Sequence, residues 1–137
     1  MFTPASSRAA NAYRQVGVQS GLTNATPHRL IQMLFEGLME RLQAALGDMQ
    51  RGDMQAKGIH LGQAVQIIAE GLKASLNTEQ GGDLAQNLAV LYDYSVRTLT
   101  MANLHNNAAQ VSEIIALLEP VAHSWNQISG TPTAEGG

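Results

Sequence analysis

Apolar residues recur at helical spacing along most of the chain, and residues 81–104, GGDLAQNLAVLYDYSVRTLTMANL, show the pattern twice. A helix advances roughly 100° per residue, so one face of this segment is a core-facing stripe of Leu84, Leu88, Leu91, Ser95, Leu99 and Ala102. About 120 to 140° away by the same rotation lies a second stripe of Val90, Tyr94, Met101 and Leu104, with Arg97 among them. A surface helix usually needs one such stripe. The second must therefore be buried by another part of the fold or by a partner.

Two further helices are predicted before this segment. Thr26 is typical of an N-cap, and Pro27 suits the first helical position, so a helix should begin there and end at Gly52. Asp53 is expected to cap a second helix that reaches about Leu76. That helix has a core stripe of Leu61, Val65, Ile68, Leu72 and Leu76, and another row of His60, Ala64, Ile67, Gly71 and Ala74.

A fourth helix is predicted from the polar turn at Asn106-Asn107 to about Ile128, with a kink at Pro120, whose ring clashes with the carbonyl four residues back. Four long helices joined by short turns favour an all-α, antiparallel up-down-up-down four-helix bundle over residues 26–128. The polar, Gly-rich residues 129–137 are expected to be a disordered tail.

Residues 1–25 lack a sustained hydrophobic period and are expected to form an N-terminal arm. Tyr13, Val16 and Val18 give this arm a few apolar anchors. A disordered tail and a detachable flap over an apolar groove are the two alternatives for it.

Composition narrows the function classes. Hydrophobic residues make up 45% of the 137 residues and aromatic residues 4%, which favours helix over sheet. There is no cysteine, so a disulfide framework and a thiol nucleophile are excluded. The formal charge of -3 comes from scattered residues, and nucleic acid is not an expected partner, since binding it usually needs a basic patch. No apolar signal segment or membrane span is visible, so a cytosolic protein is the simplest interpretation.

The sequence gives little support for catalysis. No Glu-x-x-His pair, phosphate-binding glycine loop, GxSxG or HExxH motif occurs, and the four histidines lie on separate elements. Asp93 could act as a buried acid, but no histidine or second carboxylate is near it in sequence, so a solvated charge is the favoured role. We expect no enzyme, no cofactor and no metal.

Several segments together resemble the flagellin-specific export chaperone family, FliS. They are TPHRLIQMLFEG at 26–37, SLNTEQGGDLAQNLAVLYDY at 75–94, Ala102-Asn103, and Trp125 late in the chain. The resemblance covers about residues 10–128 and implies a cytosolic helical bundle that binds the C-terminal region of newly made flagellin. It also implies that this binding prevents premature polymerisation and that flagellin is delivered to the flagellar type III export gate. The export-gate protein and an anti-sigma factor are further partners that the family suggests.

Particular residues follow from the resemblance. Tyr13 in NAYRQ matches the family's N-terminal tyrosine, so the flap role is carried to it. Pro120 departs from the family, which more often continues a regular helix there, and so do the extra glycines of the second helix.

The second apolar stripe leads to a docking hypothesis. Placing the second and third helices side by side could bring their outer rows into one groove, lined by Ala64, Ile67, Gly71, Val90, Tyr94 and Met101, with Arg97 and Leu104 beside it. Flagellin helices are expected to dock there by the helix-in-groove mode. Two alternatives stay open: a structural bundle that self-associates through this stripe, and a bundle enzyme with a metal.

Overall fold

The computed structural model describes residues 26–76 and 78–128, and within them the chain is helical with no strand. The elements are α2 (Pro27–Arg51), α3 (Met54–Gln66), the π-helical segment η1 (Ile67–Lys73), α4 (Thr78–His105) and α5 (Ala108–Ile128). The predicted all-α four-helix bundle is confirmed. The arm and the tail expected at the two ends of the chain lie outside the described residues.

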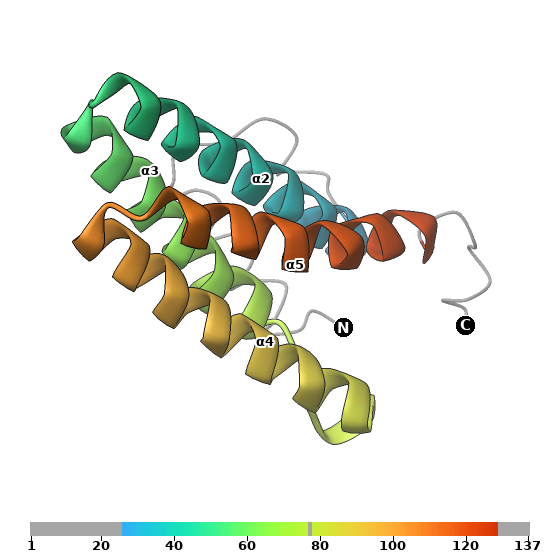
Figure 1. The fold of residues 1–137 in the computed structure, drawn as a ribbon. Helices are drawn as coiled ribbons and strands as arrows, with labels where there is room; N and C mark the ends of the chain where they lie inside the picture. Colours follow the sequence, from blue (N-terminus) through green and yellow to red (C-terminus); the bar gives the residue numbers. More distant parts are fainter. Residues whose placement is uncertain (1–25, 77, 129–137) are drawn as a thin grey trace.

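The four helices pack in a ring, each antiparallel to the next along the chain. α2 packs on α3, α3 and η1 on α4, α4 on α5, and α5 closes the ring on α2. α4 and α5 are close at the turn that joins them and diverge toward the start of α4 and the end of α5 (Figure 1). The bundle therefore has a closed end, at the α2–α3 and α4–α5 turns, and an open end at the opposite side.

Predicted capping residues set the helix starts. The Thr26 hydroxyl accepts a hydrogen bond from the Arg29 backbone N–H at 3.0 Å, and the Asp53 carboxylate accepts one from Ala56 at 3.1 Å. Gly52 ends α2 in the left-handed conformation, with φ 75°. These contacts satisfy backbone groups that the helix ends would otherwise leave unpaired.

The structure departs from the predicted elements near the α3–α4 corner. The second helix changes from α to π geometry at Ile67, which the hydrophobic spacing did not indicate. The second helix was expected to reach about Leu76, and after it α4 already begins at Thr78 and is interrupted at Gly82, where φ is 59° and ψ is -136°. A Cβ on Gly81 would lie 2.7 Å from that of Ala85, so the two glycines are required by this corner.

The core runs along the bundle axis and is most complete at the closed end. Its fully buried large side chains include Leu34, Leu38, Leu42, Leu61, Ile67, Ile68, Leu99, Val111, Ile114 and Leu118. A buried carboxylate joins α2 to α3 there: Asp48, 1% exposed, bonds Arg51 and His60, each at 2.6 Å. Paired in this way, the buried charge is not left without partners.

Candidate functional site

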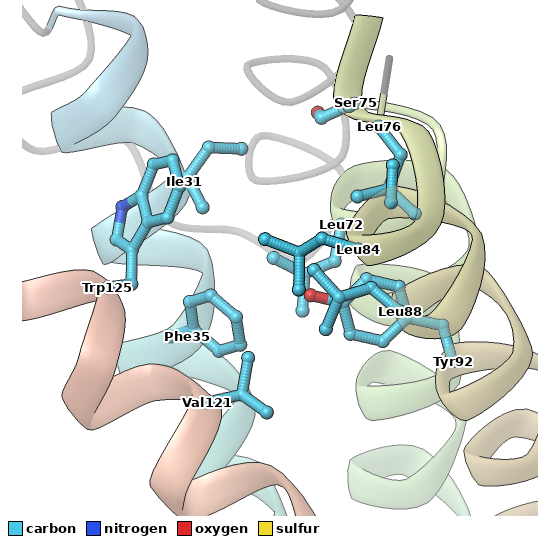
Figure 2. A pocket seen from close by; sticks show the side chains of 12 residues that line it. Ile31, Phe35, Leu72, Ser75, Leu76, Leu84, Leu88, Tyr92, Val121 and Trp125 are labelled. Atoms are coloured by element: carbon cyan, nitrogen blue, oxygen red, sulfur yellow. The ribbon is translucent and has the colours of Figure 1, made fainter. Parts of the chain in front are cut away.

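An apolar groove of about 380 Å³ lies at the open end of the bundle, and we call it the end groove. It is lined by Ile31, Phe35, Leu72, Ser75, Leu76, Gly81, Leu84, Ala85, Leu88, Tyr92, Val121 and Trp125. Ile31, Phe35, Val121 and Trp125 form one wall, from α2 and α5, and the leucines with Tyr92 form the other, from the α3–α4 side (Figure 2). All four helices of the bundle frame it, and its surface is almost entirely hydrocarbon.

Leu84 shows how open this end is. The spacing predicted it as a core residue, but its side chain is 69% exposed, so that prediction was wrong. Leu88, one turn later, is half-buried, and Leu99, nearer the closed end, is fully buried. The stripe on α4 is thus continuous, while α5 has moved too far from α4 at the open end to cover its first members. An exposed leucine at the edge of an apolar groove makes this end a candidate site for a partner or ligand.

Tyr92 forms part of the inner wall of the end groove. Tyr92 is 3% exposed, and burial raises the pKa of its phenol above the ordinary value, because the charged phenolate would lose its hydration. Tyr92 therefore stays neutral in the folded protein. Among the described residues that line the site, no other side chain is titratable, so this lining favours an uncharged, apolar surface on whatever binds.

A second apolar surface follows the outside of α4. We call Val90, Tyr94, Met101 and Leu104 the α4 outer stripe; Val90 and Leu104 are the most exposed, at 67% and 72%. The prediction that this helix carries more apolar surface than the core uses is confirmed. The Tyr94 hydroxyl donates a hydrogen bond to the Glu113 carboxylate on α5, so this ring is held over the α4–α5 seam. Arg97, exposed, adds a positive charge to the stripe.

The groove predicted from the second and third helices does not have the expected lining. Ala64 and Ile67 are fully buried in the core, and Gly71 is buried as well, so these three residues cannot face an outer groove. The cause is the orientation of the second helix, whose predicted outer row turns inward. A smaller groove of about 160 Å³ does lie between α3 and α4. It is lined by Leu61, Gly62, Val65, Leu99, Thr100 and Asn103.

Of the predicted partner-binding residues, the structure brings together those on α4 and separates them from those on the second helix. Tyr13 lies outside the described residues. The sequence interpretation missed the end groove, although two signals were present. Ile31 and Phe35 widen the apolar face of α2 beyond what a single core contact needs. Trp125, a large aromatic late in the chain, remains only partly buried.

Residues 26–76 and 78–128 hold no cluster of three or more His, Cys, Asp or Glu side chains placed to bind a metal ion. None of the helices in these ranges has the length and hydrophobicity of a membrane span.

Comparisons with known proteins show which family this chain resembles. The family described as flagellar protein FliS matches residues 9–132. The flagellar secretion chaperone FliS of Salmonella typhimurium is 48% identical over 118 residues, which cover 86% of this chain and 87% of that protein. FliSB of Pseudomonas aeruginosa is 43% identical over 122 residues, covering 89% and 96% of the two chains, and FliS of Bacillus subtilis is 29% identical over 109 residues, covering 80% of each.

The match spans nearly the whole bundle, and it assigns a role in flagellar export as a chaperone rather than as an enzyme. With 124 of the 137 residues inside the family match, counted from residue 9 to residue 132, this chain belongs to the FliS family of flagellar secretion chaperones.

Proposed function

We propose that this protein is a cytoplasmic chaperone that binds the disordered C-terminal region of flagellin, keeps it from polymerising early, and delivers it to the flagellar type III export gate. The observation that carries the proposal is the end groove, because a bundle with a complete core elsewhere leaves leucine side chains uncovered there. A segment that is disordered alone and amphipathic once helical would cover such a surface with its apolar face.

The end groove suits one helix of the client. Its walls are apolar on both sides, and a volume of about 380 Å³ accommodates a few large side chains from one face of a helix. Client residues at i, i+3 and i+4 would enter between Trp125 and Leu84, which face each other across the opening (Figure 2).

The α4 outer stripe suits a second contact. Val90 and Leu104 are 14 residues apart, or about 21 Å along a helix, which is the length of a short amphipathic helix. Tyr94 and Met101 supply large, adaptable contacts between them, and Arg97 can pair with a client carboxylate at the rim. Two modest contacts on one extended client add through effective concentration.

We also propose that Tyr13 and the arm around it compete with the client for the apolar surface. The proposal comes from the match of Tyr13 to the family pattern and from the apolar residues of the arm. A protein lacking residues 2–20 should bind a client peptide more tightly than the full chain, and equal or weaker binding contradicts a competing arm.

The test is calorimetric titration of a peptide from the C-terminal region of the cognate flagellin. Leu84→Asp should weaken binding at least tenfold, because it places a carboxylate in the end groove, and Met101→Asp should weaken it less. Ile59→Asp on α3 is the matched control, since Ile59 is also an exposed apolar residue but belongs to neither the end groove nor the α4 outer stripe.

Full-length flagellin should be captured by the wild-type protein, and flagellin lacking its C-terminal helices should not. Equal capture of the two flagellins contradicts the assignment of the client segment. A folded Leu84→Asp protein that binds like wild type contradicts the assignment of the end groove.

A self-associating bundle without a client is the second candidate, favoured by the exposure of the α4 outer stripe. Sedimentation without flagellin separates the two. A dimer that Leu104→Asp disrupts would support self-association, and a monomer supports the chaperone.

A further inference from the structure

The last turns of α5 are fastened to α2 through a reciprocal contact between His28 and Trp125. The indole N–H of Trp125 donates to the His28 carbonyl at 3.1 Å, and Nε2 of His28 lies 3.2 Å from the Trp125 carbonyl. A carbonyl only accepts, so this Nε2 carries the hydrogen. The two rings are also stacked, with centroids 4.4 Å apart and planes 9° from parallel. We call this pair the His28–Trp125 clamp.

These turns depend on such contacts more than the rest of α5 does. Pro120 has no backbone N–H, so the helix loses a hydrogen bond to the carbonyl of residue 116. The last fully buried residue of α5 is Leu118, two residues before this proline. Beyond it, the bond from Gln32 to Asn126, at 2.8 Å, also joins α5 to α2. The end of α5 is therefore held toward α2, on the side of the bundle away from Leu84.

Trp125 lines the end groove, whereas His28 does not. Because His28 is not among the described residues that line the groove, any effect it has on the groove passes through the indole. Trp125 is only partly buried, so without the clamp its indole would have more than one rotamer available.

We propose that His28 is a positioning residue for client binding: it fixes the Trp125 indole as a rigid wall, so that the end groove is formed before the client arrives. The inference rests on the proposed function, because it concerns the same groove. A preformed wall lowers the entropy that binding loses when side chains become ordered.

The chain has one tryptophan, so its fluorescence reports this wall directly. In the free protein, His28→Ala should lower the fluorescence anisotropy of Trp125 and shift its emission to longer wavelength. Calorimetric titration with the flagellin C-terminal peptide should then show roughly 3- to 10-fold weaker binding, the cost of ordering one aromatic side chain. His28→Phe keeps a ring to stack on the indole and should recover at least half of both losses.

His123→Ala is the matched control. His123 is an exposed histidine on the same turns of α5, bonded to Gln127 and absent from the groove lining, so its removal should change neither readout. Circular dichroism confirms folding of each variant, and if His28→Ala does not fold, His28→Phe and the anisotropy of Trp125 decide.

The two proposals fail in different ways. A wild-type protein that does not bind the peptide contradicts the proposed function. If the wild-type protein binds and the affinity of His28→Ala is within twofold of it, the positioning role is contradicted. It is also contradicted if His28→Ala binds more weakly while the anisotropy of Trp125 is unchanged. A His28→Phe protein with both readouts no better than those of His28→Ala contradicts it too, because the stacked ring would then have no effect.

Discussion

The closed and open ends of this bundle are built from the same four helices, yet they bury their apolar residues to different extents. At the closed end, Leu42, Leu61, Leu99 and Ile114 are fully buried. At the open end, Leu84 is mostly exposed, and Trp125 and Leu88 are only partly buried around the end groove. One end therefore supplies stability, and the other offers apolar surface. A chaperone for an apolar client needs both, because a surface that stabilised the fold by being buried could not bind a partner.

The largest expected difference between the ends is in the free energy of unfolding. Leu42→Ala removes a fully buried side chain of the closed end and should lower it by about 2–5 kcal/mol. Leu84→Ala should lower it by less than about 1 kcal/mol, because most of that side chain is already in water. Urea unfolding followed by circular dichroism measures both. A loss of several kcal/mol for Leu84→Ala would show that the open end is part of the core.

The buried carboxylate of the closed end gives the next effect. Asp48→Asn keeps the shape but removes the charge that pairs with Arg51 and His60, and should cost about 1–3 kcal/mol of stability. Asp93→Asn is the matched control: Asp93 pairs with Lys73 at 2.7 Å, but both side chains are nearly half exposed, so the change should stay below about 1 kcal/mol. If urea unfolding shows that the two substitutions lower the free energy of unfolding equally, the buried Asp48 carboxylate contributes no more than an exposed ion pair.

A smaller effect concerns alkaline pH at the inner wall of the end groove. Burial raises the folded-state pKa of Tyr92 above the value of about 10 in the unfolded chain. The stability that the neutral Tyr92 gives the folded protein is therefore fully present below pH 10 and is lost as the pH rises further. Unfolding between pH 9 and 11.5 should show this decline, and Tyr92→Phe should reduce it. If the free energy of unfolding declines equally in Tyr92→Phe, the decline comes from other groups.

The smallest expected effect on stability is at the α4 outer stripe. Met101→Asp should change the unfolding free energy by no more than about 0.5 kcal/mol, since the side chain is outside the core. Thermal unfolding measures it in the same buffer as peptide binding. A clear loss of stability would mean that the stripe packs against another part of the chain.

The sequence predicted the fold well because helix spacing and capping are local signals. Thr26, Gly52 and Asp53 mark the starts and ends that the structure shows, and the apolar period gave the four helices. The candidate site was predicted only in part. Val90 and Leu104 are exposed as expected, whereas Ala64 and Ile67 turned out to be core residues.

The reason lies in what a periodic pattern contains. Spacing shows which residues share a face of a helix, but the direction of that face depends on how the helices rotate against one another. The end groove needs a further property, the divergence of α4 from α5, which sets residues about 40 apart in the chain, such as Leu84 and Trp125, on opposite walls. The π geometry of η1 was equally invisible to a pattern of 3.6 residues per turn.

The most direct test of the account is to map the bound client on the 14.6 kDa protein by NMR. Backbone and side-chain signals would be followed while the C-terminal flagellin peptide is added. The largest shifts are expected at the end groove, at Leu84, Leu88 and the Trp125 indole, with smaller shifts along the α4 outer stripe and little change at Asp48 and Leu61. Shifts confined to the closed end, with the Trp125 indole signal unmoved at saturation, would contradict it.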